Sequence, residues 1–320
     1  MVIPRCLTTI ALTLGAFAGV PGLATAQDAK PRVVVTIKPV HSLVAKVMGS
    51  TGTPALIVDG NASPHTYSLK PSDAKALTDA EIIFRVSERL EPFTAKIRNP
   101  GSRLVTLIEA KGVTTLKARA GGPFEKHIDA ANVGKSHAHD HDAPAKGASL
   151  DGHIWLDPAN AKAMLDSIAA ALSTKAPSNT ATYKANADAA KQELDALSLE
   201  IAMTLKGLEN KPYIVFHDAY QYFERRFGLT VAGSITADPD TPLSGKRLSD
   251  VRKKITSLGA TCVFGEPNFD TKVITTVTEG TTAKTGTLDP EGASLKSGVD
   301  FYEALLRKLA ADAKACLTGN

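Results

Sequence analysis

The sequence predicts an α/β protein with two parallel-sheet lobes joined by one long, rigid helix. Three observations support this fold class. Short apolar segments alternate with helical patterns in both halves of the chain, as expected of βαβ units. Between the halves, segment 178–206 has neither Gly nor Pro and carries leucines at helical spacing. By contrast, segment 121–152 is rich in Gly, Ala, His, Asp and Lys with little periodicity, which predicts a long loop.

Each half supplies its own set of strands and helices. Strands are expected at 32–37, 54–58, 82–86, 103–107, 213–216, 229–232 and 261–264. Helices are expected at 41–48, 71–80, 158–173, 248–257 and 301–315. The chain is accordingly divided into a leader 1–26, an N-terminal lobe 27–176 that includes the loop, a connecting helix 177–210 and a C-terminal lobe 211–320. Ligands of open α/β sheets bind at the carboxyl ends of strands, so the cleft between the lobes is the expected site.

Segment 1–26 predicts a cleaved secretory signal. Arg5 provides the positive charge, 7–20 is apolar, and Ala24-Thr25-Ala26 fits the cleavage rule for small residues. The apolar run is short for a membrane anchor, which needs ~20 residues. We therefore expect an exported protein.

Composition excludes two broad classes. With 43% hydrophobic and 22% charged residues, the chain is not wholly disordered. The net charge of +4 is spread along the chain without a run of Lys and Arg. Nucleic acid is therefore not expected as the main partner.

Export affects how the cysteines are interpreted. Cys6 lies in the signal, which leaves Cys262 and Cys316 in the mature chain. Two cysteines in an oxidising compartment favour a disulfide, and the alternative is two buried free thiols. Because the chain has no Cys-x-x-Cys motif, neither a thioredoxin-like site nor a zinc ribbon is indicated.

Three histidines stand at strand or loop ends, namely His65, His153 and His217. Any one of them alone could be structural, but three such positions favour a shared site. Neutral imidazole suits Zn²⁺, and tetrahedral zinc takes four ligands, so three histidines plus an oxygen or water would fit. Spacing alone does not show that the three side chains converge.

The long loop carries three further histidines, His137, His139 and His141, which alternate with other residues including Asp140. This composition is typical of an adaptable metal-binding segment, and the alternative is a solvated polar loop. Enzyme motifs are largely missing, because the chain contains neither His-Glu-x-x-His nor Gly-x-Ser-x-Gly.

Five ordered motifs carry a family resemblance. They are SPHTYSLKPSD at 63–73, GHIWLDP at 152–158, VFHDAYQYF at 215–223, ATCVFGEP at 260–267 and GTLDP at 286–290. With the His/Asp loop, they resemble the periplasmic zinc-binding proteins of ABC uptake transporters, the ZnuA type of metal-binding solute-binding protein. The resemblance extends from about Val33 to Leu317.

The resemblance implies a periplasmic carrier that captures Zn²⁺ in the interlobe cleft and catalyses no reaction. It places the metal ligands on His65 and His153 of the N-terminal lobe and on His217 of the C-terminal lobe. It also implies a Cys262–Cys316 disulfide and a His-rich loop that gathers zinc. The implied partners are a membrane permease and its cytoplasmic ATPase, and we expect the carrier to be a monomer.

One departure concerns the fourth ligand. Some zinc-binding members have Glu immediately before the first histidine, where this chain has Pro64. The fourth position is therefore open to water, to Asp289 or to a loop histidine, and we rank water first. Asp289 aligns with the acidic ligand of manganese and iron relatives.

Two other functions remain open. A manganese or iron carrier is less favoured, because the manganese relatives have a carboxylate where this chain has His217, and imidazole prefers the zinc end of the divalent series. A zinc hydrolase would use the same three histidines and a bound water. Glu266 and Asp218 are candidates for its general base, but both are better interpreted as support for the ligands.

Overall fold

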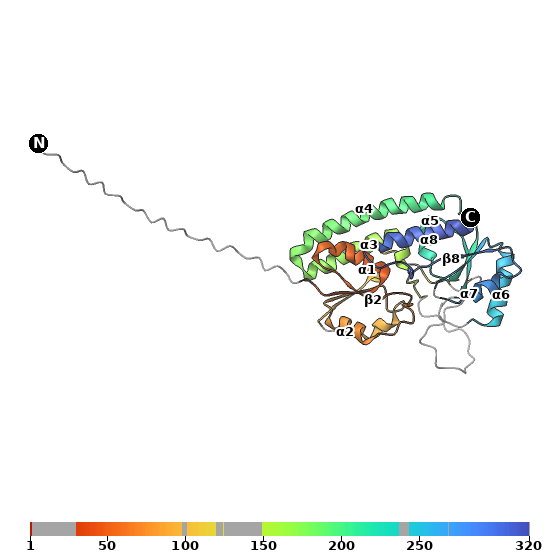
Figure 1. The fold of residues 1–320 in the computed structure, drawn as a ribbon, viewed down its shortest axis with the longest axis horizontal. Helices are drawn as coiled ribbons and strands as arrows, with labels where there is room; N and C mark the ends of the chain where they lie inside the picture. The colour runs from red at the N-terminus through yellow and green to blue at the C-terminus, as the bar shows by residue number, and fades with distance from the viewer. Residues whose placement is uncertain are drawn as a thin grey trace.

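The computed structural model describes residues 1, 30–97, 101–119, 124, 149–236, 243–267 and 269–319. Two lobes, each with a parallel sheet and flanking helices, lie side by side (Figure 1). The predicted signal, apart from its first residue, and the loop residues His137, His139 and His141 lie outside the described residues. These predictions therefore stay untested.

The N-terminal sheet has the strand order β2-β1-β3-β4, and all its strands are parallel. The strands are β1 (Val33–Ile37), β2 (Ala55–Val58), β3 (Ile82–Arg85) and β4 (Arg103–Thr106). All five residues of β1 are buried because helices cover both faces of the sheet. Helix α1 (Lys38–Met48) lies on one side and α2 (Pro71–Asp79) on the other (Figure 1). Helix α1 begins earlier than predicted because Pro39 is suited to its first turn.

The C-terminal sheet repeats this topology, with strand order β6-β5-β7-β8. Its strands are β5 (Tyr213–His217), β6 (Val231–Thr236), β7 (Cys262–Gly265) and β8 (Lys284–Thr287), and its helices are α5 (Gln221–Phe227), α6 (Gly245–Ser257) and α7 (Thr271–Thr278). Strand β8 was not predicted, because this edge strand reads Lys-Thr-Gly-Thr and is mostly exposed. The predicted strand 229–232 lies too early compared with β6, since the mostly polar second half of β6 shows no apolar pattern.

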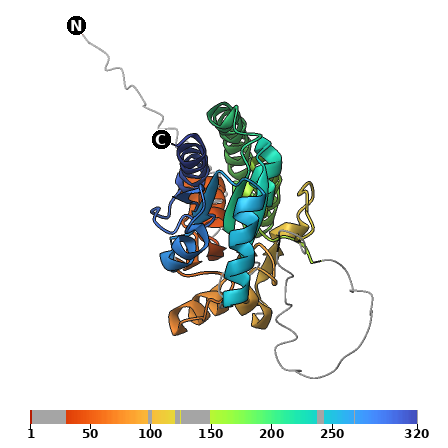
Figure 2. The ribbon, with the colours of Figure 1, turned by 90° about the vertical axis from the view of Figure 1, so that its right-hand side faces the viewer.

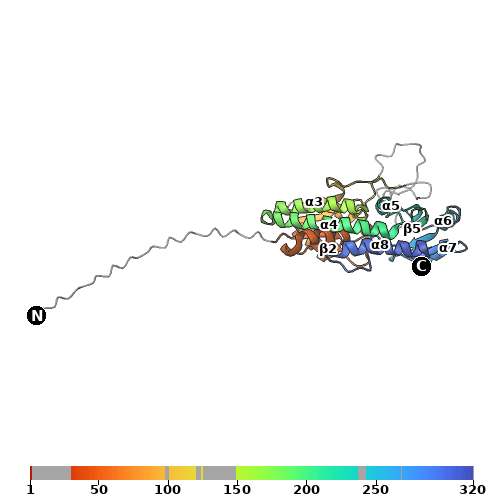
Figure 3. The same ribbon diagram turned by 90° about the horizontal axis from the view of Figure 1, so that it is seen from above.

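Three long helices, α3 (Pro158–Lys175), α4 (Thr180–Leu205) and α8 (Phe301–Thr318), run beside one another along the molecule (Figure 3). The predicted long helix is confirmed: α4 lies within 177–210, and its buried residues recur every three or four positions from Tyr183 to Leu205. Helix α8 contacts α1 of the first lobe and β8 of the second, so it is another bridge between the lobes. Figure 2 shows α4 (green) and α8 (dark blue) together, with α2 (orange) on the opposite side. The lobe boundaries themselves stay predictions.

Short 3-10 helices complete the described elements. They are η1 (Gly49–Thr51), η2 (Pro92–Lys96), η3 (Leu107–Glu109), η5 (Ile154–Leu156) and η6 (Pro177–Asn179). Within the described part of the chain, no helix is both apolar enough and long enough to span a bilayer.

One continuous hydrophobic core passes from the first lobe into the second. It includes Val35 of β1, Leu194 of α4, Leu306 of α8 and Phe264 of β7, all buried. A separate apolar cluster beneath α6 and α7 contains Val251 and Val263. Because the interlobe contact is itself core, separating the lobes would expose apolar surface, which disfavours a wide hinge motion.

Polar contacts also tie the two lobes together. The buried Lys38 ammonium of α1 donates to the carbonyl oxygens of Gly292 and Ala293, at 3.3 and 3.1 Å. Ser42 Oγ donates to the Val299 carbonyl oxygen at 2.6 Å and accepts from the Tyr302 backbone N–H at 3.1 Å. The segment that leads from β8 to α8 is therefore held on the N-terminal lobe.

A disulfide joins Cys262 of β7 to Cys316 of α8, across 54 residues of sequence. Replacing both cysteines by Ala should lower the free energy of unfolding by about 4 kcal/mol, because the cross-link restricts the unfolded chain. Urea unfolding of the oxidised wild type and the double variant measures this difference. Reduction should shift the wild-type midpoint and leave the variant unchanged. Equal midpoints for the oxidised wild type and the variant would contradict the expected stabilisation.

Candidate metal centre

The three strand-end histidines converge in the structure. His65 lies in the turn region that follows β2, His153 immediately precedes η5, and His217 is the last residue of β5. One ring nitrogen from each lies within 4.8 Å of the other two. His153 and His217 are buried and His65 is half-buried. The site thus combines loops at the carboxyl ends of both sheets, as expected for open α/β sheets.

The spacing of the imidazoles suits a shared ion. The Nε2 atoms of His153 and His217 are 3.4 Å apart. Tetrahedral ligands with Zn–N bonds of 2.0–2.1 Å stand about 3.3 Å from one another. The ring centroid of His65 lies 5.6 Å from that of His153 and 5.9 Å from that of His217. A small shift of the His65 side chain would complete a three-nitrogen set.

Carboxylates orient two of the three rings. Asp151 Oδ1 lies 2.8 Å from His153 Nδ1 and also accepts from the His153 backbone N–H at 3.0 Å. Glu266 Oε1 lies 2.6 Å from His217 Nδ1. When Nδ1 donates its proton to a carboxylate, the lone pair of Nε2 is left to face a metal. Both Nε2 atoms therefore point toward the common centre.

The titration of His217 reflects two opposing effects. Burial lowers the pKa of His217, but the carboxylates of Glu266, Asp218 and Asp151 outweigh burial and raise the pKa above its usual value. The same negative charge would favour a bound dication, since opposite charges attract strongly where water is excluded.

Further contacts fix the segments that carry the histidines. Trp155 packs beside His153 and donates Nε1–H to the Pro290 carbonyl oxygen at 2.9 Å, while the Tyr302 hydroxyl donates to the Trp155 carbonyl oxygen at 2.6 Å. In the His65 loop, the Tyr67 hydroxyl donates to Asp73 Oδ2 at 2.7 Å, at the first turn of α2. These bonds connect the loops to secondary structure.

Asp289 follows β8 and lines a small cleft with His217, Glu266 and Ser63. Both its oxygens accept backbone N–H groups, Oδ2 from Ala293 at 2.6 Å and Oδ1 from Glu291 at 3.2 Å. Within the described part of the chain, the only group of possible ligands that meets the 4.8 Å spacing is the three histidines, without Asp289. The carboxylate of Asp289 therefore stabilises a turn in this structure.

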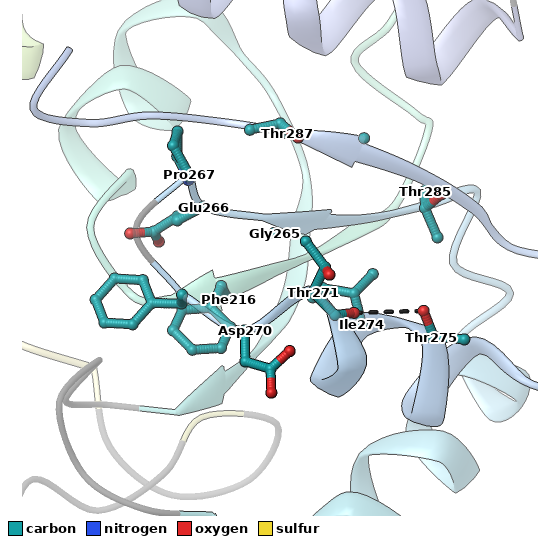
Figure 4. Close-up of a pocket in the computed structure, with 12 residues that line it drawn as sticks. Phe216, Gly265, Glu266, Pro267, Asp270, Thr271, Ile274, Thr275, Thr285 and Thr287 are labelled. Atoms are coloured by element: carbon teal, nitrogen blue, oxygen red, sulfur yellow. Dashed lines mark hydrogen bonds between the residues drawn. The ribbon is translucent and has the colours of Figure 1, made fainter. Parts of the chain in front are cut away.

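A larger pocket of about 260 Å³ adjoins the site at the carboxyl ends of β7 and β8 (Figure 4). Glu266 and Pro267 line both this pocket and the small cleft beside His217. Threonine side chains supply much of its polar wall, and its lining among the described residues contains no histidine. Of the residues that line both the pocket and the cleft, Glu266 is the one that contacts a histidine of the metal centre, at His217 Nδ1.

Two residues that contact the site, Asp151 and Arg119, were not predicted from the sequence. Asp151 was missed, although its place two residues before His153 is a local signal for a side chain that can reach Nδ1. Arg119 was also missed, and it pairs with Asp218 and Glu224, which lie about a hundred positions later in the chain. Asp218 does support the site region, through its ion pair with Arg119 and through the effect of its charge on His217.

The family model that matches this chain and two of its curated relatives are described as zinc-uptake proteins. The family described as zinc-uptake complex component A, periplasmic (ZnuA), matches residues 33–316. The high-affinity zinc uptake system protein ZnuA of Brucella suis is 45% identical and covers 98% of this chain and 99% of its own length. The protein of that name from Paracoccus denitrificans is 35% identical, covering 96% of this chain and 97% of its own length.

Solved structures agree in fold. A ZnuA deletion mutant with zinc bound superposes with a TM-score of 0.70 at 26% identity, covering 89% of this chain and 98% of that structure. The laminin-binding protein of Streptococcus agalactiae has a TM-score of 0.70 at 23% identity, covering 88% of this chain and 99% of its own. The latter similarity supports the fold alone.

The raised pKa of His217 predicts how Zn²⁺ binding depends on pH. A ligating imidazole must be deprotonated, so affinity should fall as the pH drops through the pKa of His217, starting above the ordinary histidine value of about 6.5. Calorimetry between about pH 5.5 and about pH 7.5 measures this loss. Glu266→Gln removes a main cause of the raised pKa and should move the onset to lower pH. Equal affinity across the range would contradict nitrogen ligation.

Proposed function

The chain belongs to the family of periplasmic zinc-uptake components, and from this premise we propose that it captures Zn²⁺ and delivers it to an ABC permease. The observation that carries the proposal is the meeting of His65, His153 and His217 within 4.8 Å. We propose these three imidazoles as the ligands of the transported ion. The protein would act in the periplasm as a monomer and catalyse no reaction, leaving ATP hydrolysis to the cytoplasmic partner of the permease.

The chemistry of the site favours zinc over manganese. Three imidazole nitrogens suit the zinc end of the divalent series, whereas Mn²⁺ prefers oxygen donors. The carboxylates of Asp151 and Glu266 stand behind two of the rings and would balance the charge of a bound dication. A site with this charge could hold Zn²⁺ away from bulk water without an uncompensated buried charge.

Water is our first choice for the fourth ligand. The cleft beside His217 and Asp289 has a volume of about 10 Å³, close to what one water molecule requires. Asp289 ranks second because its carboxylate already accepts the backbone N–H groups of Glu291 and Ala293 and lies outside the group of possible ligand atoms, among the described residues, that meet within 4.8 Å. Ligation by a loop histidine stays a prediction, because His137, His139 and His141 lie outside the described residues.

A zinc hydrolase is less well supported than a carrier, because the two residues that could act as its general base already bind other side chains. Glu266 is engaged by His217 Nδ1, and Asp218 is engaged by the guanidinium of Arg119. A general base must instead reach the water that it activates. The arrangement therefore supports the carrier proposal.

Loss of a proposed ligand should lower the affinity for Zn²⁺ more than loss of the His-rich loop does. We expect His217→Ala to weaken Zn²⁺ binding by more than the roughly 100-fold that removal of an outer-shell partner can cost. Deletion of 134–148, which contains His137, His139 and His141, should have a smaller effect because that segment would gather zinc only in an auxiliary way. Competition with a chelator of known affinity measures both. If the deletion weakened binding more than His217→Ala, the proposed ligand set would be wrong.

A further inference from the structure

The two ends of the long loop are joined beside the metal site. We call residues 116–119 and 149–153 the loop neck. Lys117 and Leu150 form an antiparallel bridge. The Ala118 backbone N–H donates to the Ser149 carbonyl oxygen at 2.8 Å, and the Asp151 N–H donates to the Leu116 carbonyl oxygen at 2.9 Å. The neck ends at His153, so its position determines where this ligand stands.

Helix α5 of the C-terminal lobe holds the neck from the other side. The Tyr222 hydroxyl accepts from the Leu116 N–H and donates to the Asp151 carbonyl oxygen, both at 2.9 Å. Gln221 Nε2 donates to the Lys117 carbonyl oxygen at 3.0 Å and to Asp151 Oδ2 at 3.2 Å. Asp151 is thus hydrogen-bonded to Gln221 through Oδ2 and to the His153 ring through Oδ1. The orientation of the His153 ring therefore depends on a helix of the opposite lobe.

Arg119 supplies the charged part of this contact. Its Nε donates to both oxygens of Asp218 at 3.0 Å, and its Nη1 donates to Glu224 Oε2 at 2.6 Å. The side chains of Asp218 and Glu224 are only 2% and 6% exposed. Two buried carboxylates that share one guanidinium would be left uncompensated without it, which is costly in a protein interior. The planar fork of Arg can serve both carboxylates at once, and the ammonium of Lys lacks this geometry.

We propose that Arg119 is a positioning residue of the metal site, which holds the loop neck on α5 and thereby keeps Asp151 and His153 opposite His217. This inference rests on the proposed function, since it concerns ligands proposed for Zn²⁺. Asp218 directly follows His217, so the Arg119 pair joins the neck to the strand end that carries the third imidazole. The spacing of His153 and His217 is therefore set at the point where the two lobes meet.

Loss of Arg119 should displace the neck without separating the lobes. A second ion pair joins α5 to the N-terminal lobe, because Arg226 donates to both oxygens of Asp157, at 2.6 and 2.8 Å. Helices α4 and α8 and the continuous core also remain. The expected defect is a loosened ligand in a folded protein.

The test compares Arg119→Met and Arg119→Lys with Arg307→Met in the full chain. Arg307 pairs with Glu200 between α8 and α4, so its replacement removes the same charge without touching the neck. Zn²⁺ affinity from chelator competition, the visible spectrum of bound Co²⁺ and circular dichroism of the metal-free protein are measured. Arg119→Met should weaken Zn²⁺ binding on the order of tenfold and alter the Co²⁺ bands. Arg119→Lys should recover part of the loss, and Arg307→Met should match the wild type.

The inference is overturned if Arg119→Met matches Arg307→Met in affinity and in the Co²⁺ spectrum. Should Arg119→Met fail to fold, Arg119→Lys decides: altered Co²⁺ bands support the inference, and wild-type bands overturn it. A wild-type protein that does not bind Zn²⁺ would refute the proposed function and this inference together. Normal wild-type binding with an unaffected Arg119→Met variant would refute the inference alone.

Discussion

The Nε2 atoms of His153 and His217 lie 3.4 Å apart although the two residues belong to different lobes, and much of the fold serves to maintain that distance. An ion shared by both rings tolerates little variation in their separation, because metal–nitrogen bonds are short and directional. The lobes are accordingly joined by α4, by α8 and by a continuous apolar core. Preorganised imidazoles need not be ordered when the metal arrives, which favours tight binding.

The carboxylates near the histidines each have a partner that fixes them or balances their charge. Asp151 and Glu266 lie behind the rings and select the tautomer in which Nε2 is free to ligate. Asp218 and Glu224 are neutralised by Arg119, and Asp289 is engaged by backbone N–H groups. Carboxylates thus surround the three nitrogen donors of the proposed site without replacing them, and such a donor set would favour zinc over harder cations.

The sequence predicted those parts of the fold that depend on local pattern. Buried strands such as β1 and the long helix α4 follow from apolar runs and periodicity, and the placing of three histidines at strand and loop ends indicated a shared site. Strand β8 was missed because Lys-Thr-Gly-Thr pairs only at an edge and has no apolar signal. The bridging role of α8 was missed because periodicity shows which face is buried and not what covers it.

The contacts around the site were harder to predict for the same reason. The bond between Arg119 and Asp218 joins residues 99 positions apart, and that between Glu266 and His217 spans 49 positions. The first pair depends on how the lobes dock, and the second depends on β5 and β7 being neighbours in one sheet. Single-sequence patterns encode neither arrangement. The cysteine pair, by contrast, was predicted both from the two cysteines that lie outside the predicted signal and from the family resemblance, and Cys262 and Cys316 are joined in the structure.

X-ray absorption spectroscopy at the zinc edge of the loaded protein tests the central claim most directly. The account predicts a four-coordinate ion with three imidazole nitrogens and one oxygen at about 2.0–2.1 Å. A spectrum dominated by oxygen ligands, or one with a single imidazole, would contradict it.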